Sequence, residues 1–269
     1  MSRDPLKTRL SRRQALGALG TVSLGGLLAA CGDDDGGAVA RQTVQTTDGA
    51  TATVEPRTTT SGATAALFDD AASCAVTPEE TEGPYYFDAD KIRSDIREDR
   101  KGTRLRLALR VRDAGSCTPI QDAVVDIWHA DAGGAYSGFD GGGDGAGGGP
   151  GGPGGGGGAQ TQTRYLRGAQ VTNGEGIVEF TTVYPGWYPG RTVHIHAKVH
   201  LDAKTVLTTQ LYFDDALSDR VFAAPPYSER GERDQRNDAD GIFGEALVMT
   251  AKTEGDGVRS VMSFDVRRS

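Results

Sequence analysis

Residues 104–112 alternate between charged and apolar side chains, with arginine at four of the polar positions. Successive side chains of a strand point to opposite faces, so this period of two predicts a strand with one buried face. The apolar run at residues 123–130 predicts a second strand, with Val124, Asp126 and Trp128 on one of its faces.

Six further short segments have the apolar, β-branched composition of strands. They are residues 168–172, 176–180, 192–200, 206–213, 246–250 and 260–266. We expect the first two to pair as a hairpin about the Asn173-Gly174 turn. Many short strands, frequent turns and little helix predict an all-β fold, an antiparallel β-sandwich.

Glycine is concentrated in one tract rather than spread along the chain. The chain has 39 glycines, and 15 of them lie among the 22 residues at 138–159. Such a tract cannot build a core, so we expect a flexible surface loop that leaves the domain just after Tyr136. The net charge of −8 argues against a nucleic-acid partner.

The first 31 residues have the pattern of an export signal. Ser11-Arg-Arg-Gln-Ala-Leu16 precedes an apolar run of small residues, as in twin-arginine signals. The run ends in Leu28-Ala-Ala-Cys31, which resembles a lipoprotein cleavage box with Cys31 as the lipidated residue. The alternative is a plain signal peptide with a chance cysteine. We therefore expect an exported protein, either anchored to the membrane of the cell envelope through Cys31 or extracellular.

Residues 32–73 are rich in Asp, Gly, Ala and Thr, and we expect a disordered tether there. The folded domain would then span residues 74–269. An exported chain with Cys74 and Cys117 left over favours a disulfide, and two reduced thiols are the alternative. We expect Glu80 to be a solvated charge and the aromatic segment at residues 81–87 to serve mainly in packing.

The candidate chemistry is concentrated at residues 184–196. His194 and His196 are two apart, so a strand would present both imidazoles on one face. Tyr188 and Arg191 lie just upstream, in a Pro/Gly-rich turn, and Tyr136 follows the end of an earlier strand. A bare His-x-His pattern also fits two surface histidines, so the spacing alone leaves the metal site open.

Five motifs, in order over residues 78–213, together resemble the intradiol ring-cleavage dioxygenases. The motifs are Thr-Glu-Gly-Pro-Tyr-Tyr, Ile-Trp-His-Ala-Asp followed by Gly-Ala-Tyr-Ser, Pro-Gly-Trp-Tyr, Arg-Thr-Val-His-Ile-His and Thr-Gln-Leu-Tyr-Phe. Any one of them alone would be weak, but the ordered set is specific.

The resemblance implies a non-haem ferric ion, Fe(III), held by two tyrosinates and two histidines. The matching positions are Tyr136, Tyr188, His194 and His196, with Tyr188 and His196 as the axial pair.

Two further pocket residues, Arg191 and Gln210, match the same family. Arg191 would stabilise negative charge on the ring, Gln210 would orient Arg191 or the substrate, and Tyr188 would also take a substrate proton. The implied substrates are a catechol-type ring and O2, and the product is a cis,cis-muconate-type diacid.

The donor set differs from other common metal sites. Phenolate oxygen is a hard, anionic donor that suits ferric iron, and no acid completes a two-His-one-carboxylate or His-rich zinc pattern. Two alternatives remain: a non-catalytic β-sandwich binding module at the cell surface, and a zinc- or copper-binding lipoprotein that uses His194 and His196. The ring substituents of the substrate and the oligomeric state stay open.

Overall fold

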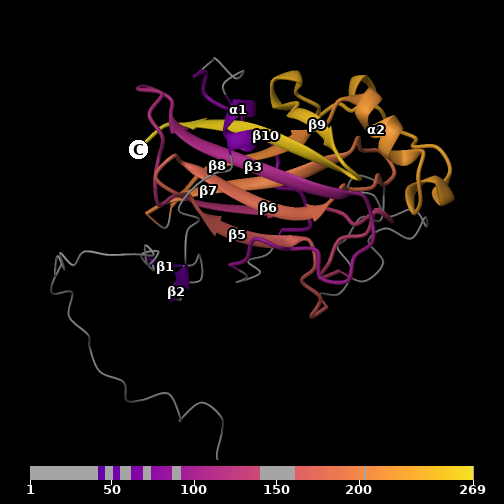
Figure 1. Ribbon diagram of the computed structural model, residues 1–269, viewed down its shortest axis with the longest axis horizontal. Helices are drawn as coiled ribbons and strands as arrows, with labels where there is room; N and C mark the ends of the chain where they lie inside the picture. Colours follow the sequence, from indigo (N-terminus) through magenta and orange to yellow (C-terminus); the bar gives the residue numbers. More distant parts are fainter. Residues whose placement is uncertain are drawn as a thin grey trace, which may run out of the picture. The chain divides into compact units, whose positions relative to one another are not determined.

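The structure is a computed structural model that describes residues 42–45, 51–54, 62–68, 74–86, 92–139, 161–202 and 204–268. Within these residues, two four-stranded sheets share one hydrophobic core, and only two segments form α-helices (Figure 1). The β-sandwich predicted from the alternating pattern is confirmed.

One sheet has the strand order β6-β3-β10-β9. β6 and β9 are antiparallel to their neighbours, whereas β10 runs parallel to β3, an exception to the expected antiparallel pattern. A parallel pair needs a long crossover connection, and here the chain builds the second sheet before it returns as β10. The strands are β3 (Arg104–Asp113), β6 (Ile177–Val183), β9 (Thr250–Glu254) and β10 (Gly257–Val266).

The other sheet has the order β5-β4-β7-β8 and is antiparallel throughout. Its register pairs His196 with Trp128 on one side and with Gln210 on the other. Residues directly opposite each other share a face of the sheet, so these three side chains lie together. The strands are β4 (Val124–Trp128), β5 (Arg167–Val171), β7 (His194–Leu201) and β8 (Lys204–Tyr212).

Apolar side chains that alternate with polar ones fill the space between the sheets. Full burial of a leucine or isoleucine side chain contributes about 1.5–3 kcal/mol. Because one face of β7 packs in this core, His194 and His196 lie on its other face. The central strands contribute Leu105, Leu107 and Leu109 from β3 and Ile195, Ala197 and Val199 from β7, each at most 1% exposed.

The predicted hairpin at Asn173-Gly174 is wrong in its pairing. Asn173 does close a tight turn, because its Oδ1 accepts hydrogen bonds from the backbone N–H groups of Glu175 and Ile177. However, β5 pairs with β4 and β6 pairs with β3, so the turn carries the chain from one sheet to the other. An Asn-Gly dipeptide specifies a local turn, whereas the buried faces of the strands decide the pairing.

The predicted strand at residues 246–250 is also wrong. Glu245–Leu247 forms the short 3-10 helix η3, which turns Leu247 into the core, and β9 begins only at Thr250. An apolar run of this length fits either structure by periodicity. The other helical segments in this half are α2 (Asp215–Phe222), η1 (Tyr227–Arg230) and η2 (Asn237–Ala239).

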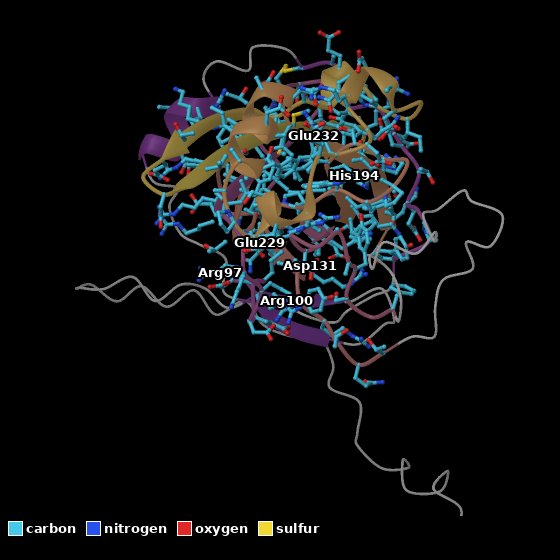
Figure 2. The ribbon with its side chains drawn as sticks, turned by 90° about the vertical axis from the view of Figure 1, so that its right-hand side faces the viewer. Arg97, Arg100, Asp131, His194, Glu229 and Glu232 are labelled. Carbon is cyan, nitrogen blue, oxygen red and sulfur yellow. A yellow bond between two sulfur atoms is a disulfide. The ribbon has the colours of Figure 1, made fainter. Side chains whose placement is uncertain are left out.

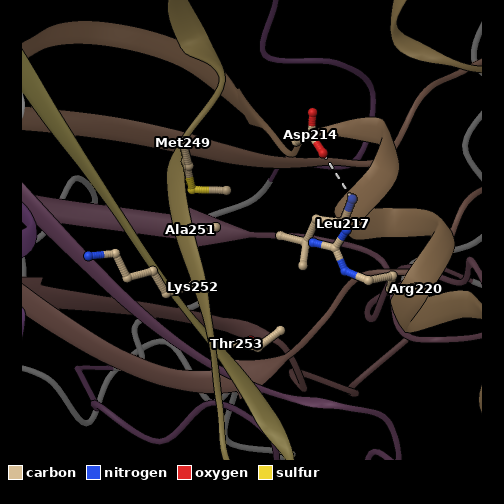
Figure 3. A pocket seen from close by; sticks show the side chains of 7 residues that line it. All are labelled: Asp214, Leu217, Arg220, Met249, Ala251, Lys252 and Thr253. Atoms are coloured by element: carbon tan, nitrogen blue, oxygen red, sulfur yellow. Dashed lines mark hydrogen bonds between the residues drawn. The ribbon is translucent and has the colours of Figure 1, made fainter.

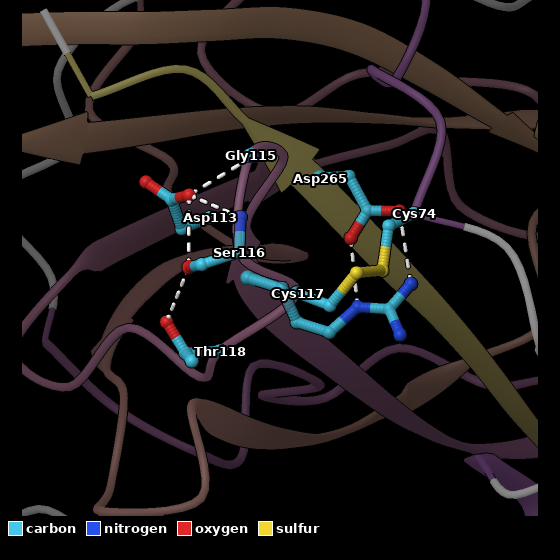
Figure 4. Close-up of a disulfide and its surroundings, with 8 residues drawn as sticks. Cys74, Asp113, Gly115, Ser116, Cys117, Thr118 and Asp265 are labelled. Carbon is cyan, nitrogen blue, oxygen red and sulfur yellow. Dashed lines mark hydrogen bonds and ion pairs between the residues drawn. A yellow bond between two sulfur atoms is a disulfide. The ribbon is translucent and has the colours of Figure 1, made fainter.

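The disulfide that the sequence left open is present between Cys74 and Cys117 (Figure 4). It joins the start of the sandwich domain to the turn that follows β3, 43 residues later. Asp265 lies beside it in Figure 4 and forms an ion pair with Arg112, whose Nε is 2.7 Å from Asp265 Oδ1.

Part of the segment expected to be a tether has regular structure. It contains a hairpin of β1 (Gln42–Gln45) with β2 (Thr51–Val54) and the helix α1 (Gly62–Phe68). Leu67 and Phe68 of α1 are buried against Ala108, Ile177 and Val261 of the first sheet, so α1 packs on the sandwich domain.

The signal segment at residues 1–31, Cys31, most of residues 32–73 and residues 140–160 of the glycine tract lie outside the described residues. Among the helices that the structure describes, none has the length and apolar character needed to cross a membrane.

Candidate functional site

Two buried histidines occupy the face of β7 that points away from the core. His194 and His196 are 3% and 2% exposed, and their Nε2 atoms lie 3.2 Å apart. The alternation of the strand therefore places both imidazoles together, as the spacing predicts. Figure 2 shows His194 among the side chains of the folded domain.

Two tyrosines from separate loops converge on the same point. The Tyr136 hydroxyl lies 3.3 Å from His194 Nε2, and the Tyr188 hydroxyl lies 3.0 Å from it. Tyr136 follows β4 and Tyr188 follows β6, and both rings are buried. The four residues that the sequence predicts as metal ligands are thus brought together around one nitrogen.

The loop that carries Tyr136 is held by a carboxylate turn. Asp131 Oδ1 accepts hydrogen bonds from the backbone N–H groups of Gly133 and Ala135, at 2.9 and 3.0 Å. An Asp side chain that caps the backbone in this way fixes a short loop without regular structure. Tyr136 therefore leaves the strand end in a defined direction.

The two tyrosine-bearing loops touch through glycines. A Cβ on Gly186 would collide with the carbonyl of Ala132, and one on Gly134 would collide with that of Trp187. Arg230 bridges the same two loops, because it donates to the carbonyl oxygens of Ala132 and Trp187 at 2.8 and 2.7 Å. The close contact sets the distance between the two phenols.

Burial dominates the electrostatics of the four donors. It raises the pKa of Tyr188 to about 12 and that of Tyr136 well above its usual value. Burial, followed by the charge of Arg191, lowers the pKa of His194 to about 3, and burial also lowers that of His196. Without a cation, the site therefore holds two neutral phenols and two neutral imidazoles.

The hydrogen bonds of His194 identify its tautomer. Its Nδ1 lies 2.7 Å from the Thr192 carbonyl oxygen, so Nδ1 carries the proton and Nε2 presents a lone pair. That one lone pair faces two phenol oxygens and a second imidazole nitrogen. One lone pair cannot accept a full hydrogen bond from each of the three neighbours.

A metal ion fits this arrangement. First-row metals bind nitrogen and oxygen ligands at about 2 Å, so neighbouring ligands lie about 3 Å apart. The separations of 3.0, 3.2 and 3.3 Å around His194 Nε2 agree with that value. A trivalent cation would also reverse the raised phenol pKa values and favour tyrosinate.

Arg191 and Gln210 lie beside the four donors and contact each other. Arg191 Nη2 donates to Gln210 Oε1 at 2.6 Å, and Gln210 Nε2 donates to the carbonyl of Thr81 at 3.0 Å. Arg191 is 6% exposed and Gln210 is fully buried. The structure thus brings together all six residues that the sequence singled out.

Asp240 is a site residue that the sequence did not reveal. Its Oδ2 accepts from Arg191 Nε and from the backbone N–H of Thr192, both at 2.9 Å. Burial raises the pKa of Asp240, but hydrogen bonds and the charge of Arg191 hold it below its ordinary value. Asp240 comes from the irregular segment after η2, where no periodic pattern separates it from other surface acids.

The expectation that Glu80 is a solvated charge is wrong. Its Oε2 accepts the hydroxyl proton of Tyr212 at 2.6 Å, and partial burial raises its pKa. Tyr212 lies opposite His194 in the β7–β8 register. Glu80 therefore belongs to the polar network behind the site.

The aromatic segment before residue 87 does more than cover the sandwich. The Tyr85 ring stacks on the Tyr136 ring, with centroids 4.5 Å apart and an interplanar angle of 16°. Trp128, from β4, stacks on His196 with centroids 4.8 Å apart and an angle of 6°. Two of the four donors are thus held by flat aromatic contacts.

A separate hollow of about 540 Å³ lies between α2 and β9 (Figure 3). It is lined by the charged residues Asp214, Arg220 and Lys252, together with Leu217, Met249, Ala251 and Thr253. Asp214 is already used as the N-cap of α2, where it accepts from the Leu217 N–H. None of the six site residues lines this hollow.

Comparison with solved structures finds relatives that match nearly three quarters of this chain. An intradiol ring-cleavage dioxygenase from Tetranychus urticae is 34% identical with a TM-score of 0.62, over 72% of this chain and 95% of that one. The dioxygenase domain of a dioxygenase carbohydrate-binding protein fusion from Streptomyces sp. SirexAA-E is 30% identical with a TM-score of 0.52, over 72% and 99%.

Curated relatives match a smaller part of the chain. Chlorocatechol 1,2-dioxygenase of Rhodococcus opacus is 30% identical over 138 residues, 44% of this chain and 47% of the relative. Catechol 1,2-dioxygenase 1 of Acinetobacter lwoffii is 29% identical over 185 residues, 57% and 54%. The chain thus spans about half the length of these relatives, and no family model matches it.

Proposed function

The chain belongs to the intradiol ring-cleavage dioxygenases, and from this premise we propose that it is an Fe(III) enzyme that opens a catechol-type ring between its two hydroxylated carbons. Both atoms of O2 would enter a cis,cis-muconate-type diacid. The curated relatives act on catechol or chlorocatechol by name, which supports this substrate class.

One observation carries the proposal. Two phenol oxygens and a second imidazole nitrogen lie within 3.3 Å of His194 Nε2, and all four side chains are buried. Tyr136, Tyr188, His194 and His196 would hold the ion. Two anionic oxygens and two neutral nitrogens favour Fe(III) over softer or divalent ions.

A bound ferric ion would supply Lewis acidity, which acidifies the tyrosine and catechol hydroxyls and draws electron density from the substrate ring. The protein must then remove two catechol protons. Tyr188 Oη would accept one of them, because burial favours the protonated form of this phenol when no cation holds it as the phenolate.

Arg191 supplies a fixed positive charge beside the donors. Asp240 and Gln210 hold its guanidinium at Nε and Nη2, and its pKa is raised, so it stays protonated despite burial. A preorganised cation in a water-poor pocket stabilises negative charge that develops on the ring. Gln210 is anchored to the Thr81 carbonyl and would keep Arg191 in this orientation.

The first test is the colour and metal content of the purified protein. Tyrosinate bound to Fe(III) should give a burgundy-red charge-transfer band, one iron per chain, and O2 uptake with substituted catechols. A colourless protein that carries stoichiometric zinc would reject the proposal. A protein without stoichiometric metal would support the binding-module alternative.

The assignment of Tyr136 is tested by Tyr136→Phe. We expect the visible band to shift or bleach, because one of the two tyrosinates is lost. Tyr184→Phe is the matched control, since Tyr184 is equally buried but bonds Ser218, away from the four donors. An unchanged spectrum for Tyr136→Phe would remove it from the ligand set.

Export and lipid anchoring are part of the same proposal. The supporting observations are the twin-arginine pattern, Cys31 in its cleavage box, and a disulfide of the kind found mainly in oxidising compartments. Cys31→Ala should release the protein from the membrane fraction. Continued membrane attachment of this variant would argue against the anchor.

A further inference from the structure

The two histidines of the site differ in how their rings are held. His194 donates from Nδ1 to the Thr192 carbonyl, a contact that fixes both its tautomer and its ring plane. His196 Nδ1 is buried and makes no hydrogen bond to any described residue. Histidine ligands generally need such an outer contact to keep their orientation, so another contact must orient His196.

That contact is Trp128. The β4–β7 register places it directly beside His196, and the two rings stack with an interplanar angle of 6°. Trp128 is 1% exposed, and its own Nε1 makes no hydrogen bond to any described residue. The indole therefore acts here through its flat face rather than through its N–H group.

Further residues support the stack from the other side. The Tyr86 ring lies 4.8 Å from that of Trp128, and Lys198 Nζ lies 3.5 Å from the centre of the Tyr86 ring. Lys198 also forms an ion pair with Glu82. A cation over an aromatic face is attracted to it. Lys198 therefore holds the Tyr86 ring against Trp128, on the side of the indole away from His196.

Gly83 limits the remaining freedom of His196. A Cβ at this position would lie 3.2 Å from His196 Cε1, and the residue has φ +72°. The backbone of the segment therefore lies over one edge of the imidazole while Trp128 covers its face. Rotation of the His196 ring out of the site would require both to move.

We propose that Trp128 is the positioning residue for His196 and takes the place of the missing Nδ1 hydrogen bond. This inference rests on the proposed function for its metal readout, but the ring order of His196 can be measured without metal. A stack fixes the plane of the ring and leaves its Nε2 lone pair pointing at the site. His196 then lacks the Nδ1–H···O bond that makes His194 the more basic donor.

The test compares Trp128→Leu, which removes the aromatic face, with Trp128→Phe, which keeps one. Phe180→Leu is the matched control, since Phe180 is an equally buried aromatic residue in the other sheet. Circular dichroism and thermal unfolding show which variants are folded. A loss of stability shared with Phe180→Leu reports packing alone.

The first readout uses metal-free protein and histidine ring NMR. In Trp128→Leu, one of the four histidine Hε1 signals should split or broaden by conformational exchange. Trp128→Phe and Phe180→Leu should keep it sharp. A single sharp signal for every histidine in folded Trp128→Leu would overturn the proposal, whether or not the protein binds iron.

The second readout is Fe(III) binding against a competing chelator, with the visible and electron paramagnetic resonance spectra of the loaded protein. Trp128→Leu should bind iron about 10- to 100-fold more weakly and change the ferric signal. Trp128→Phe should restore most of both. If wild-type protein binds no iron, the proposed function fails, and the NMR result still decides the role of Trp128.

Discussion

At the scale of single residues, burial keeps all four donors neutral until a cation is present. The phenols of Tyr136 and Tyr188 have raised pKa values, and the imidazoles of His194 and His196 have lowered ones. A pocket of this kind favours a high charge at its centre, because only such a charge offsets the cost of ionising a buried phenol.

Arg191→Gln should reduce kcat by about 10²–10³-fold, because the variant loses the positive charge proposed to stabilise the ring. Iron binding and the visible band should persist, because Arg191 is not one of the four proposed ligands. Arg112→Gln is the control, since it breaks a similar buried ion pair, with Asp265, next to the disulfide. Steady-state O2 uptake and iron analysis measure the two effects. Equal losses of kcat in both variants would mean that Arg191 acts only on stability.

At the scale of elements, the site is built by strand alternation and by loop contact. β7 presents its core residues on one face and its histidines on the other, while the loops after β4 and β6 each bring one tyrosine. These loops approach so closely that only glycine fits at positions 134 and 186. The spacing of the two phenols therefore depends on loop packing rather than on either strand.

Gly186→Ala should lower the free energy of unfolding by about 1–3 kcal/mol through overpacking, and it should weaken the charge-transfer band because Tyr188 is two residues away. Gly174→Ala is the control, because the nearest atom to its added Cβ would lie 3.9 Å away. Denaturant unfolding and visible spectra measure both effects. A normal band in Gly186→Ala would show that the loops have room to adjust.

At the scale of the whole molecule, a disulfide and two hydrogen bonds fix the N-terminal end of the sandwich domain. They lie just before the aromatic segment that packs against the site. Cys74 is bonded to Cys117, and Thr77 then exchanges hydrogen bonds with Asp265 of β10. The Thr77 N–H donates to the Asp265 carbonyl at 3.0 Å, and the Asp265 N–H donates to Thr77 Oγ1 at 2.8 Å.

Replacing both cysteines by serine should lower the free energy of unfolding by about 2–4 kcal/mol, because the closed loop spans 43 residues and its loss frees the unfolded chain. Urea unfolding of the variant and of the oxidised wild type measures the difference. Reduced wild type should match the variant. If oxidised and reduced wild type unfold at the same urea concentration, the disulfide contributes no stability.

His129 should make stability depend on pH below neutrality. It is buried between the Ala130 carbonyl and the Thr182 hydroxyl, each 2.8 Å away, and burial lowers its pKa from 6.5 to about 4. The unfolded chain therefore binds a proton at a higher pH than the folded one. Stability is full above pH 6.5 and falls by up to about 3 kcal/mol as pH drops to about 4.

The measurement is the pH dependence of unfolding for wild type and for His129→Gln. The variant should be less stable at pH 7 but show a shallower decline toward pH 4. The other histidines contribute equally to both proteins, so the difference in slope belongs to His129. Parallel curves would exclude this residue as the source.

The sequence predicts the residues of the candidate site better than it predicts the pairing of the strands. The site could be predicted because short motifs occur along the chain in the order of a known family. These motifs contain Tyr136, Tyr188, Arg191, His194 and His196. Asp240 could not be predicted, because it is one acid among many in an irregular segment. The partners of β5, β6 and β10 could not either, since alternation reports a buried face but not the strand that covers it.

Local order along the chain is enough to specify most of the strands, the face of β7 that bears the histidines and the chemical types of the donors, because these follow from a period of two and from side-chain identity. Folding alone brings the phenols to within 3.3 Å of His194 Nε2, pairs Arg191 with Asp240 and lays Trp128 on His196. Apart from the contact of Tyr188 with His194, these contacts join residues about 50 to 70 positions apart, and only the packing of loops and neighbouring strands sets such distances.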